Sequence, residues 1–202
     1  MKTSQGRTPQ KINMRTFIAI ELPQGIKDSL SRLQEELKAT EADVKWVAPE
    51  NIHLTLKFLG EIDDKKLEKI TKIIDDAAKE KNKFQIRISS LGAFPKIDFP
   101  RVIWVGVDIG DKETKAIAEE LEEKIAKIGI PKENRPFSSH ITIGRTKSSL
   151  NREKLVQNLK NKAELGANKL EFYVTKITLF QSTLTPHGPI YKVLKETNLK
   201  TT

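Results

Sequence analysis

The chain carries two copies of one short unit, in which a histidine, an aliphatic residue, a threonine and a second aliphatic residue follow one another. The copies are His53-Leu54-Thr55-Leu56 and His140-Ile141-Thr142-Ile143. Side chains of a β-strand alternate between its two faces. Each copy therefore predicts a strand that buries its aliphatic residues and presents its histidine and threonine together. A single copy is most simply a half-buried histidine on a sheet, but two matching copies in a chain with three histidines indicate a shared function.

Composition sets the class of protein. At 202 residues the chain can form one domain or two small lobes. It has 36 basic and 27 acidic residues, a formal net charge of +9, which favours anionic partners such as RNA. It has no apolar run long enough for a bilayer, so no membrane association is expected. The absence of cysteine excludes disulfides and thiolate chemistry and is typical of the reducing cytoplasm.

Hydrophobic periodicity predicts strands that alternate with amphipathic helices. Helical spacing is clearest in Ile26, Leu30, Leu33 and Leu37, and Asp63 and Asn151 are the expected caps of two later helices. Glycine and proline indicate a loop over residues 92–100, and one continuous strand is expected over residues 169–182.

The expected fold class is α+β, a bilobed molecule in which two mainly antiparallel sheets face a central cleft and helices pack outside. Residues 14–202 are expected to form this single two-lobed domain and to act as a monomer. Residues 1–13 are expected to be a disordered tail or a cloning remnant. Beyond the two histidine units, the halves show no general sequence repeat.

Two histidines and two threonines on facing strands can perform acid–base chemistry on a phosphodiester. Imidazoles with pKa values near 6.5 can serve as base and acid at neutral pH, and the hydroxyls of Thr55 and Thr142 can donate to phosphate oxygens. Arg145 could add a two-pronged contact. Strict alternation would bury Arg145, so we expect the strand to end at Ile143 or to bulge at Gly144 and turn the guanidinium towards the histidines.

Other chemistries fit less well. Zinc needs three or four close ligands, and neither unit has a companion cysteine, histidine or carboxylate, so no metal or cofactor is expected. The chain lacks a phosphate-binding glycine loop and a dinucleotide fingerprint. Ser138 or Ser139 could belong to a serine–histidine–acid triad, but no nucleophile-elbow sequence supports one.

Over about residues 14–197 the chain resembles the two-histidine phosphoesterases, and within them the RNA 2′,3′-cyclic phosphodiesterases, also called 2′–5′ RNA ligases. One departure is Ser139, where many relatives have proline. The resemblance is carried by Met14-Arg15-Thr16-Phe17-Ile18-Ala19-Ile20, His53-Leu54-Thr55-Leu56-Lys57-Phe58-Leu59-Gly60, Phe94-Pro95, Arg101-Val102-Ile103-Trp104, Arg135-Pro136-Phe137, His140-Ile141-Thr142-Ile143-Gly144-Arg145 and Gly188-Pro189-x-Tyr191.

The resemblance implies metal-independent opening of RNA 2′,3′-cyclic phosphate ends, such as those of tRNA fragments, to 2′-phosphates. In some relatives it implies the reverse reaction too, which forms a 2′–5′ linkage. By the same resemblance His53 and His140 are catalytic, and Thr55, Thr142 and Arg145 bind the phosphate. The family pattern leaves open which histidine is the acid and which the base; the working hypothesis is that His140 is the base for water and His53 the acid for the 3′-oxygen.

Three aromatic residues, Phe17, Phe58 and Trp46, are candidates for stacking a base, with core packing as the alternative for each. His187 lies between prolines and a glycine and is expected at the surface. The rival functions are a phosphodiesterase for small cyclic nucleotides and an RNA- or nucleotide-binding module with weak turnover.

Overall fold

The computed structural model describes residues 13–163, 170–186 and 188–201. The expected tail, apart from Asn13, and His187 lie outside these described residues. Nine strands, four α-helices and a 3₁₀ turn are described. They are β1 (Met14–Glu21), α1 (Gln24–Lys38), β2 (Val44–Trp46), η1 (Pro49–Asn51), β3 (His53–Ile62), α2 (Asp64–Lys79), β4 (Phe84–Lys96), β5 (Phe99–Val107), α3 (Asp111–Ala126), β6 (His140–Thr146), α4 (Arg152–Asn161), β7 (Leu170–Val174), β8 (Lys176–Thr185) and β9 (Gly188–Asn198).

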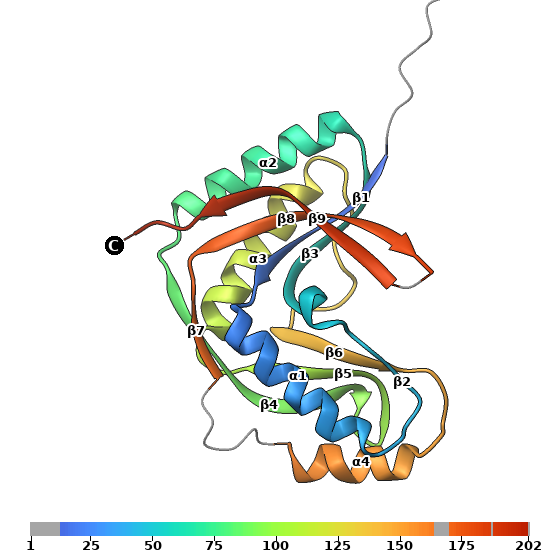
Figure 1. Ribbon diagram of the computed structural model, residues 1–202. Coiled ribbons are helices and arrows are strands. Elements are labelled where there is room, and N and C mark those ends of the chain that lie inside the picture. Colours follow the sequence, from blue (N-terminus) through green and yellow to red (C-terminus); the bar gives the residue numbers. More distant parts are fainter. Residues whose placement is uncertain (1–12, 164–169, 187, 202) are drawn as a thin grey trace, which may run out of the picture.

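The strands form a single curled sheet in the order β7-β4-β5-β6-β3-β1-β8-β9, and β2 pairs with β6 (Figure 1). All pairings between these strands are antiparallel. β3 and β6 share one residue pair, Leu54 with Ile141, so the sheet consists of two halves that meet at the two histidine strands. The α+β fold class is confirmed, and the two expected sheets are the halves of this one sheet.

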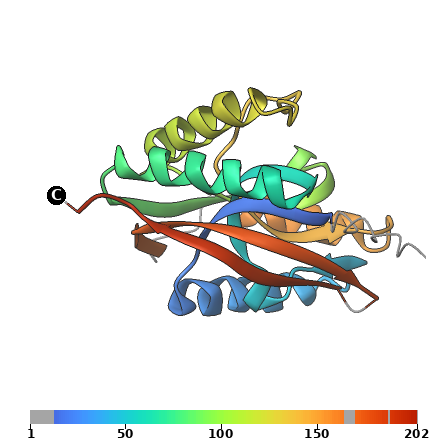
Figure 2. The same cartoon turned by 90° about the horizontal axis from the view of Figure 1, so that it is seen from above.

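The helices cover the two halves separately. α2 and α3 lie side by side over β3, β8 and β9, while α1 contacts β7 and α4 on the other half (Figures 1 and 2). Each helix buries an aliphatic stripe; in α1 it comprises Ile26, Leu30, Leu33 and Leu37, as the spacing predicts. One hydrophobic cluster runs through both halves, and this burial is the main force that holds the sheet in its curled form.

Two sequence-based expectations about loops and strands are wrong. Residues 92–100 are largely strand, because β4 continues to Lys96 and β5 begins at Phe99. The indole of Trp104 packs over Gly92, where a Cβ would lie 2.5 Å from the ring. Gly92 therefore allows close packing rather than a loop.

The second difference concerns residues 169–182, where one strand was expected. The described part of this segment holds two strands, β7 paired with β4 and β8 paired with β1, so the chain crosses from one half of the sheet to the other at Thr175. Both strands combine buried and partly exposed residues, and such a pattern does not reveal a change of partner strand.

Among the described residues, no helix is both long enough and apolar enough to span a membrane.

Candidate active site

The two histidine units lie on β3 and β6 with the predicted alternation. His53 and Thr55 are half-buried while Leu54 and Leu56 are buried. The second unit repeats this pattern, with Ile141 and Ile143 in the core and the histidine and threonine on the opposite face. Because equivalent residues Leu54 and Ile141 pair directly, the polar faces of the two units are neighbours across the junction of the half-sheets.

Each strand bulges at the last residue of its unit. In β6, Thr142 pairs with Trp104 and Gly144 with Ile103, so Ile143 is the extra residue. The bulge places Arg145 on the face of the histidine, and Arg145 is exposed. A bulge that redirects Arg145 is therefore present as expected, but its extra residue is Ile143, one residue before Gly144.

The bulge in β3 is equivalent. Thr55 pairs with Ala19 and Lys57 with Ile18, so Leu56 is the extra residue and Phe58 turns to the histidine face. Phe58 and Arg145 thus hold matching positions in the two units. The residues that directly precede Phe58 and Arg145, Lys57 and Gly144, lie on the core side of their strands.

Contacts from β2 and α1 stabilise the bulge in β6. The carbonyl oxygen of Ile143 accepts hydrogen bonds from Gln34 Nε2 at 2.8 Å and from the Val47 N–H at 3.0 Å. A Cβ at Gly144 would lie 2.9 Å from Val44 and 3.0 Å from the Trp46 ring. Only glycine fits this close approach of β2 to the bulge.

The two imidazole rings are held in the same way. The Nδ1–H of His53 donates to the carbonyl oxygen of Asn51, and that of His140 donates to the carbonyl oxygen of Ser138, each at 2.8 Å. A carbonyl oxygen can only accept, so Nδ1 carries the proton in both neutral rings. Both Nε2 atoms are left with a lone pair for substrate.

Aromatic rings surround both histidines. The His53 ring lies 4.8 Å from the Phe17 ring and 5.4 Å from that of Tyr191, while the His140 ring lies 5.0 Å from Phe94. This burial lowers the pKa of His53 to about 4. It also lowers the pKa of His140, with a further contribution from the positive charge of Arg145. The pKa values near 6.5 expected from sequence are therefore wrong for the free site, because apolar surroundings disfavour the imidazolium.

Hydrogen-bond donors for an anion lie beside the rings. Within the described part of the chain, neither Thr55 nor Thr142 uses its hydroxyl in a hydrogen bond, and the Arg145 guanidinium has no ion pair. The charge of Arg145 lowers the pKa of His140 and acts on Tyr191 of β9, whose pKa burial raises. Arg145 therefore stands near residues of both halves of the sheet.

The structure brings together most of the residues that the sequence singled out. Phe17 is buried against His53, and Phe58 is 53% exposed with its ring 6.2 Å from that of Phe17. Trp46 instead packs on the core side of β6, against Gly144. Of the three stacking candidates, Phe58 alone is an exposed aromatic on the histidine face.

Sequence reasoning did not assign site roles to four aromatic residues that surround the histidines. They are Phe94, Trp104, Phe180 and Tyr191. Three of them were visible within the motifs that carry the family resemblance, but their proximity to a histidine depends on strand pairing. Phe180, which stacks on Phe17 at 5.1 Å, carried no sequence signal.

No cluster of three or more histidine, cysteine, aspartate or glutamate side chains suited to a metal ion occurs in the described ranges. The hydrogen-bond donors that face the site are the threonine hydroxyls and the Arg145 guanidinium. This set suits an anion rather than a cation.

A curled antiparallel sheet that presents two histidine–threonine units side by side, on the face opposite the core, is the arrangement of the two-histidine phosphoesterases. The family model of LigT-like phosphoesterases matches residues 20–104 and 107–191, and the chain belongs to this family. The model matches twice, and His53 and His140 each lie 33 residues after the start of their match. The expectation of no general repeat is therefore wrong, because the two halves share a family pattern that their direct comparison did not show.

Curated relatives match nearly the whole chain. The chain is 38% identical over 184 residues to an RNA 2′,3′-cyclic phosphodiesterase of Methanothermobacter thermautotrophicus, covering 89% of this chain and 96% of the relative. It is 38% identical over 183 residues to the enzyme of the same name from Methanocaldococcus jannaschii, covering 91% and 99%. Among solved structures, E. coli LigT complexed with 3′-AMP superposes with a TM-score of 0.78 at 25% identity, covering 94% of this chain and 99% of LigT.

The lowered pKa values predict that both histidines are neutral at pH 7 in the free protein. The folded pKa of His53 lies below its unfolded value, so protonation as the pH falls from about 6.5 towards 4 destabilises the fold. Histidine Cε1–H chemical shifts, followed by NMR and assigned with a His53→Gln variant, should show a His53 midpoint well below 6. A midpoint near 6.5 would contradict the burial of this ring.

The bulge predicts that Arg145→Lys loses activity without loss of fold. Lysine keeps the charge but lacks the planar pair of donors, so kcat/KM on a cyclic phosphate substrate should fall about 10-fold, consistent with one charge-assisted hydrogen bond. The melting temperature should stay unchanged, since Arg145 makes no ion pair within the described residues. Arg32→Lys, at an exposed position on α1, is the matched control; an equal loss in both variants would remove the special role of Arg145.

Proposed function

We propose that the protein hydrolyses RNA 2′,3′-cyclic phosphate ends to 2′-phosphates by two-histidine acid–base catalysis that requires no metal. One observation carries this proposal: His53 and His140 have the same Nδ1-to-carbonyl hydrogen bond, and among the described residues neither Nε2 nor the hydroxyl of the threonine on the same strand face has a partner. The names of the curated relatives support the same activity.

In the proposed reaction the phosphate lies between the two Nε2 atoms. Nε2 of His140 takes a proton from water as the oxygen attacks phosphorus, and the bond from phosphorus to the 3′-oxygen breaks. Nε2 of His53 gives its proton to that oxygen, leaving a 2′-phosphate. Thr55, Thr142 and Arg145 donate hydrogen bonds to the non-bridging oxygens, where negative charge increases in the transition state.

The acid must gain its proton when substrate binds. Burial holds His53 neutral in the free site, and a bound phosphate anion favours the imidazolium by direct attraction. Substrate binding is thus coupled to proton uptake, and the two rings titrate as a pair with macroscopic pKa values. A bell-shaped dependence of activity on pH is the expected consequence.

The test is to incubate the protein with a short RNA that ends in a 2′,3′-cyclic phosphate, in the presence of EDTA. A 2′-phosphate product at undiminished rate is expected, because the proposed donors are all side chains. A 3′-phosphate product would show that the bond to the 2′-oxygen breaks instead and would refute the proposal. Activity restored only by added metal would point to a metal-bound hydroxide as nucleophile.

His53→Ala and His140→Ala provide the control for that experiment. Each should lower kcat by about 10²–10⁴-fold, the usual contribution of a positioned acid or base. If either folded variant kept near-native turnover, that histidine would be structural and the two-histidine mechanism would fail.

Two rival functions share the same site: hydrolysis of small cyclic nucleotides, and reverse ligation of a cyclic phosphate to a 5′-hydroxyl. A hollow of about 610 Å³ favours a longer RNA, because it lies beyond Arg145 at the end of β6 and its lining includes Arg101, Lys147 and Arg152. Within the described residues none of these three cations has an ion pair. The strand geometry continues beyond Thr146, since the Lys147 N–H donates to the Asp43 carbonyl oxygen at 2.8 Å.

We therefore infer that the RNA chain leaves the site past Arg145 and places a backbone phosphate in this basic hollow. Cations that contact phosphates supply affinity that does not depend on sequence and that weakens with salt. The cytoplasm, where tRNA fragments with cyclic ends are candidate substrates, is the proposed location, and the monomer is the proposed working form.

Lys147→Ala should distinguish long substrates from short ones. We expect KM for a cyclic-phosphate decanucleotide to rise several-fold, with a weaker dependence on salt, because one phosphate contact is lost. Turnover of a nucleoside 2′,3′-cyclic monophosphate should stay the same. Lys112→Ala, an exposed lysine on α3, is the matched control, and equal effects on both substrates would favour small cyclic nucleotides as the natural substrate.

A further inference from the structure

Lys57 is a cation in the protein core, two residues beyond Thr55 on β3. Its side chain is 1% exposed, and the bulge at Leu56 turns it away from the histidine face towards α3. A buried ammonium is costly unless it is paired and hydrogen-bonded. The contacts that offset this cost indicate what Lys57 does.

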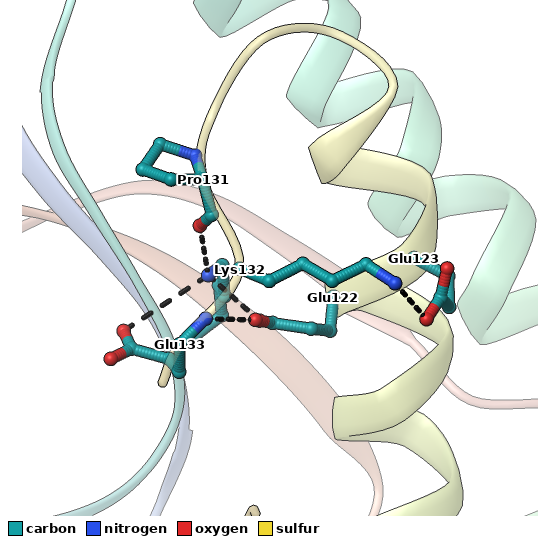
Figure 3. Close-up of polar contacts among 6 residues, drawn as sticks. Glu122, Glu123, Pro131, Lys132 and Glu133 are labelled. Atoms are coloured by element: carbon teal, nitrogen blue, oxygen red, sulfur yellow. Dashed lines mark hydrogen bonds and ion pairs between the residues drawn. The ribbon is translucent and has the colours of Figure 1, made fainter. Parts of the chain in front are cut away.

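The ammonium of Lys57 reaches α3 and the segment that follows it. Nζ lies 2.7 Å from a carboxylate oxygen of Glu122, donates to the carbonyl oxygen of Pro131 at 2.9 Å, and lies 4.0 Å from Glu133. Figure 3 shows the two carboxylates and the Pro131 carbonyl converging on one point, where the ammonium lies. Lys57 therefore connects the strand of the first histidine to residues 131–133.

Residues 131–139 form no helix or strand, and they lead directly into His140. Ser138, near the end of this segment, supplies the carbonyl oxygen that orients the His140 ring. At its start the segment is attached to α3, since the Glu133 N–H donates to Glu122 and Lys132 pairs with Glu123 (Figure 3). Glu122 and Glu123 thus attach the segment to α3, whereas Lys57 attaches it to β3.

This contact matters because β3 and β6 are paired directly only at Leu54 and Ile141. One residue pair leaves the relative tilt of two strands weakly determined. Lys57 provides a second link, from β3 to the segment before His140. This link restricts the orientation of β6 relative to β3. The equivalent position in β6 is Gly144, which has no side chain to make a reciprocal link.

We propose that Lys57 is a positioning residue that sets the second histidine relative to the first, by holding residues 131–133 against β3. It touches no substrate. The inference builds on the proposed function, since its kinetic consequence is misalignment of His140 with a phosphate bound at His53. Small displacements of a catalytic group lower kcat strongly.

The central experiment compares Lys57→Met with Lys57→Met/Glu122→Gln. The single variant leaves the Glu122 carboxylate without its cation, so it should lose stability as well as activity. The double variant removes both charges but keeps an oxygen that can accept from the Glu133 N–H, so the segment stays on α3 and only the link to β3 is lost. We expect its melting temperature to recover while kcat remains about 10- to 100-fold below wild type and KM changes less than threefold.

A second readout does not need activity. In the folded double variant, the Cε1–H resonance of His140 should shift while that of His53 stays in place. Lys81→Met, which removes a 3.0 Å ion pair to Glu120 on the same helix α3, is the matched control and should move neither resonance nor kcat.

The outcomes separate the two proposals. Inactive wild-type protein with a His140 shift in the double variant would refute the cyclic phosphodiesterase and leave the positioning role standing. Recovery of both stability and kcat in the double variant, or an unchanged His140 resonance, would show that Lys57 only stabilises the fold. If Lys57→Met fails to fold, the double variant still decides the question.

Discussion

β3 and β6 meet through one residue pair, Leu54 and Ile141, and both residues directly follow a histidine. Both side chains are fully buried, so the pair is fixed by core packing rather than by an extended ladder of hydrogen bonds. The two polar faces come together only because these aliphatic residues are held in the core. The position of the site thus depends on burial on the opposite side of the same two strands.

The bulges add two further side chains, Phe58 and Arg145, to the face that carries the histidines. Without them, period-two alternation would put Phe58 and Arg145 into the core and aim Lys57 at the histidines. A buried polar side chain stabilises each bulge. In β6, Gln34 donates a hydrogen bond to the carbonyl oxygen of Ile143. In β3, the bulge directs Lys57 into the core, where it pairs with Glu122. Polar residues within the core therefore determine how the surface residues of the cleft point.

The sequence was sufficient where the signal is local. Alternation at His53 and His140 predicted the strand faces, and the cost of burying a guanidinium predicted the bulge before Arg145. Signals that depend on pairing were not accessible: the crossover at Thr175 and the packing of Trp104 over Gly92 follow from which strands are neighbours. The low pKa of His53 belongs to the same group, because the rings that bury it come from β1 and β9.

The pairing of Leu54 with Ile141 has a geometric consequence for substrate direction. Equivalent residues that pair in antiparallel strands lie on a local two-fold axis, so the histidines and threonines of the two halves are related by that axis. A cyclic phosphate on the axis meets the same donors in either direction, and these four residues alone cannot distinguish its 2′-oxygen from its 3′-oxygen. Along β3 and β6 themselves, the first difference on this face is Phe58 on one strand and Arg145 on the other. Any choice between the two ester bonds must therefore come from the residues around this symmetric centre, which are aromatic on one side and cationic on the other.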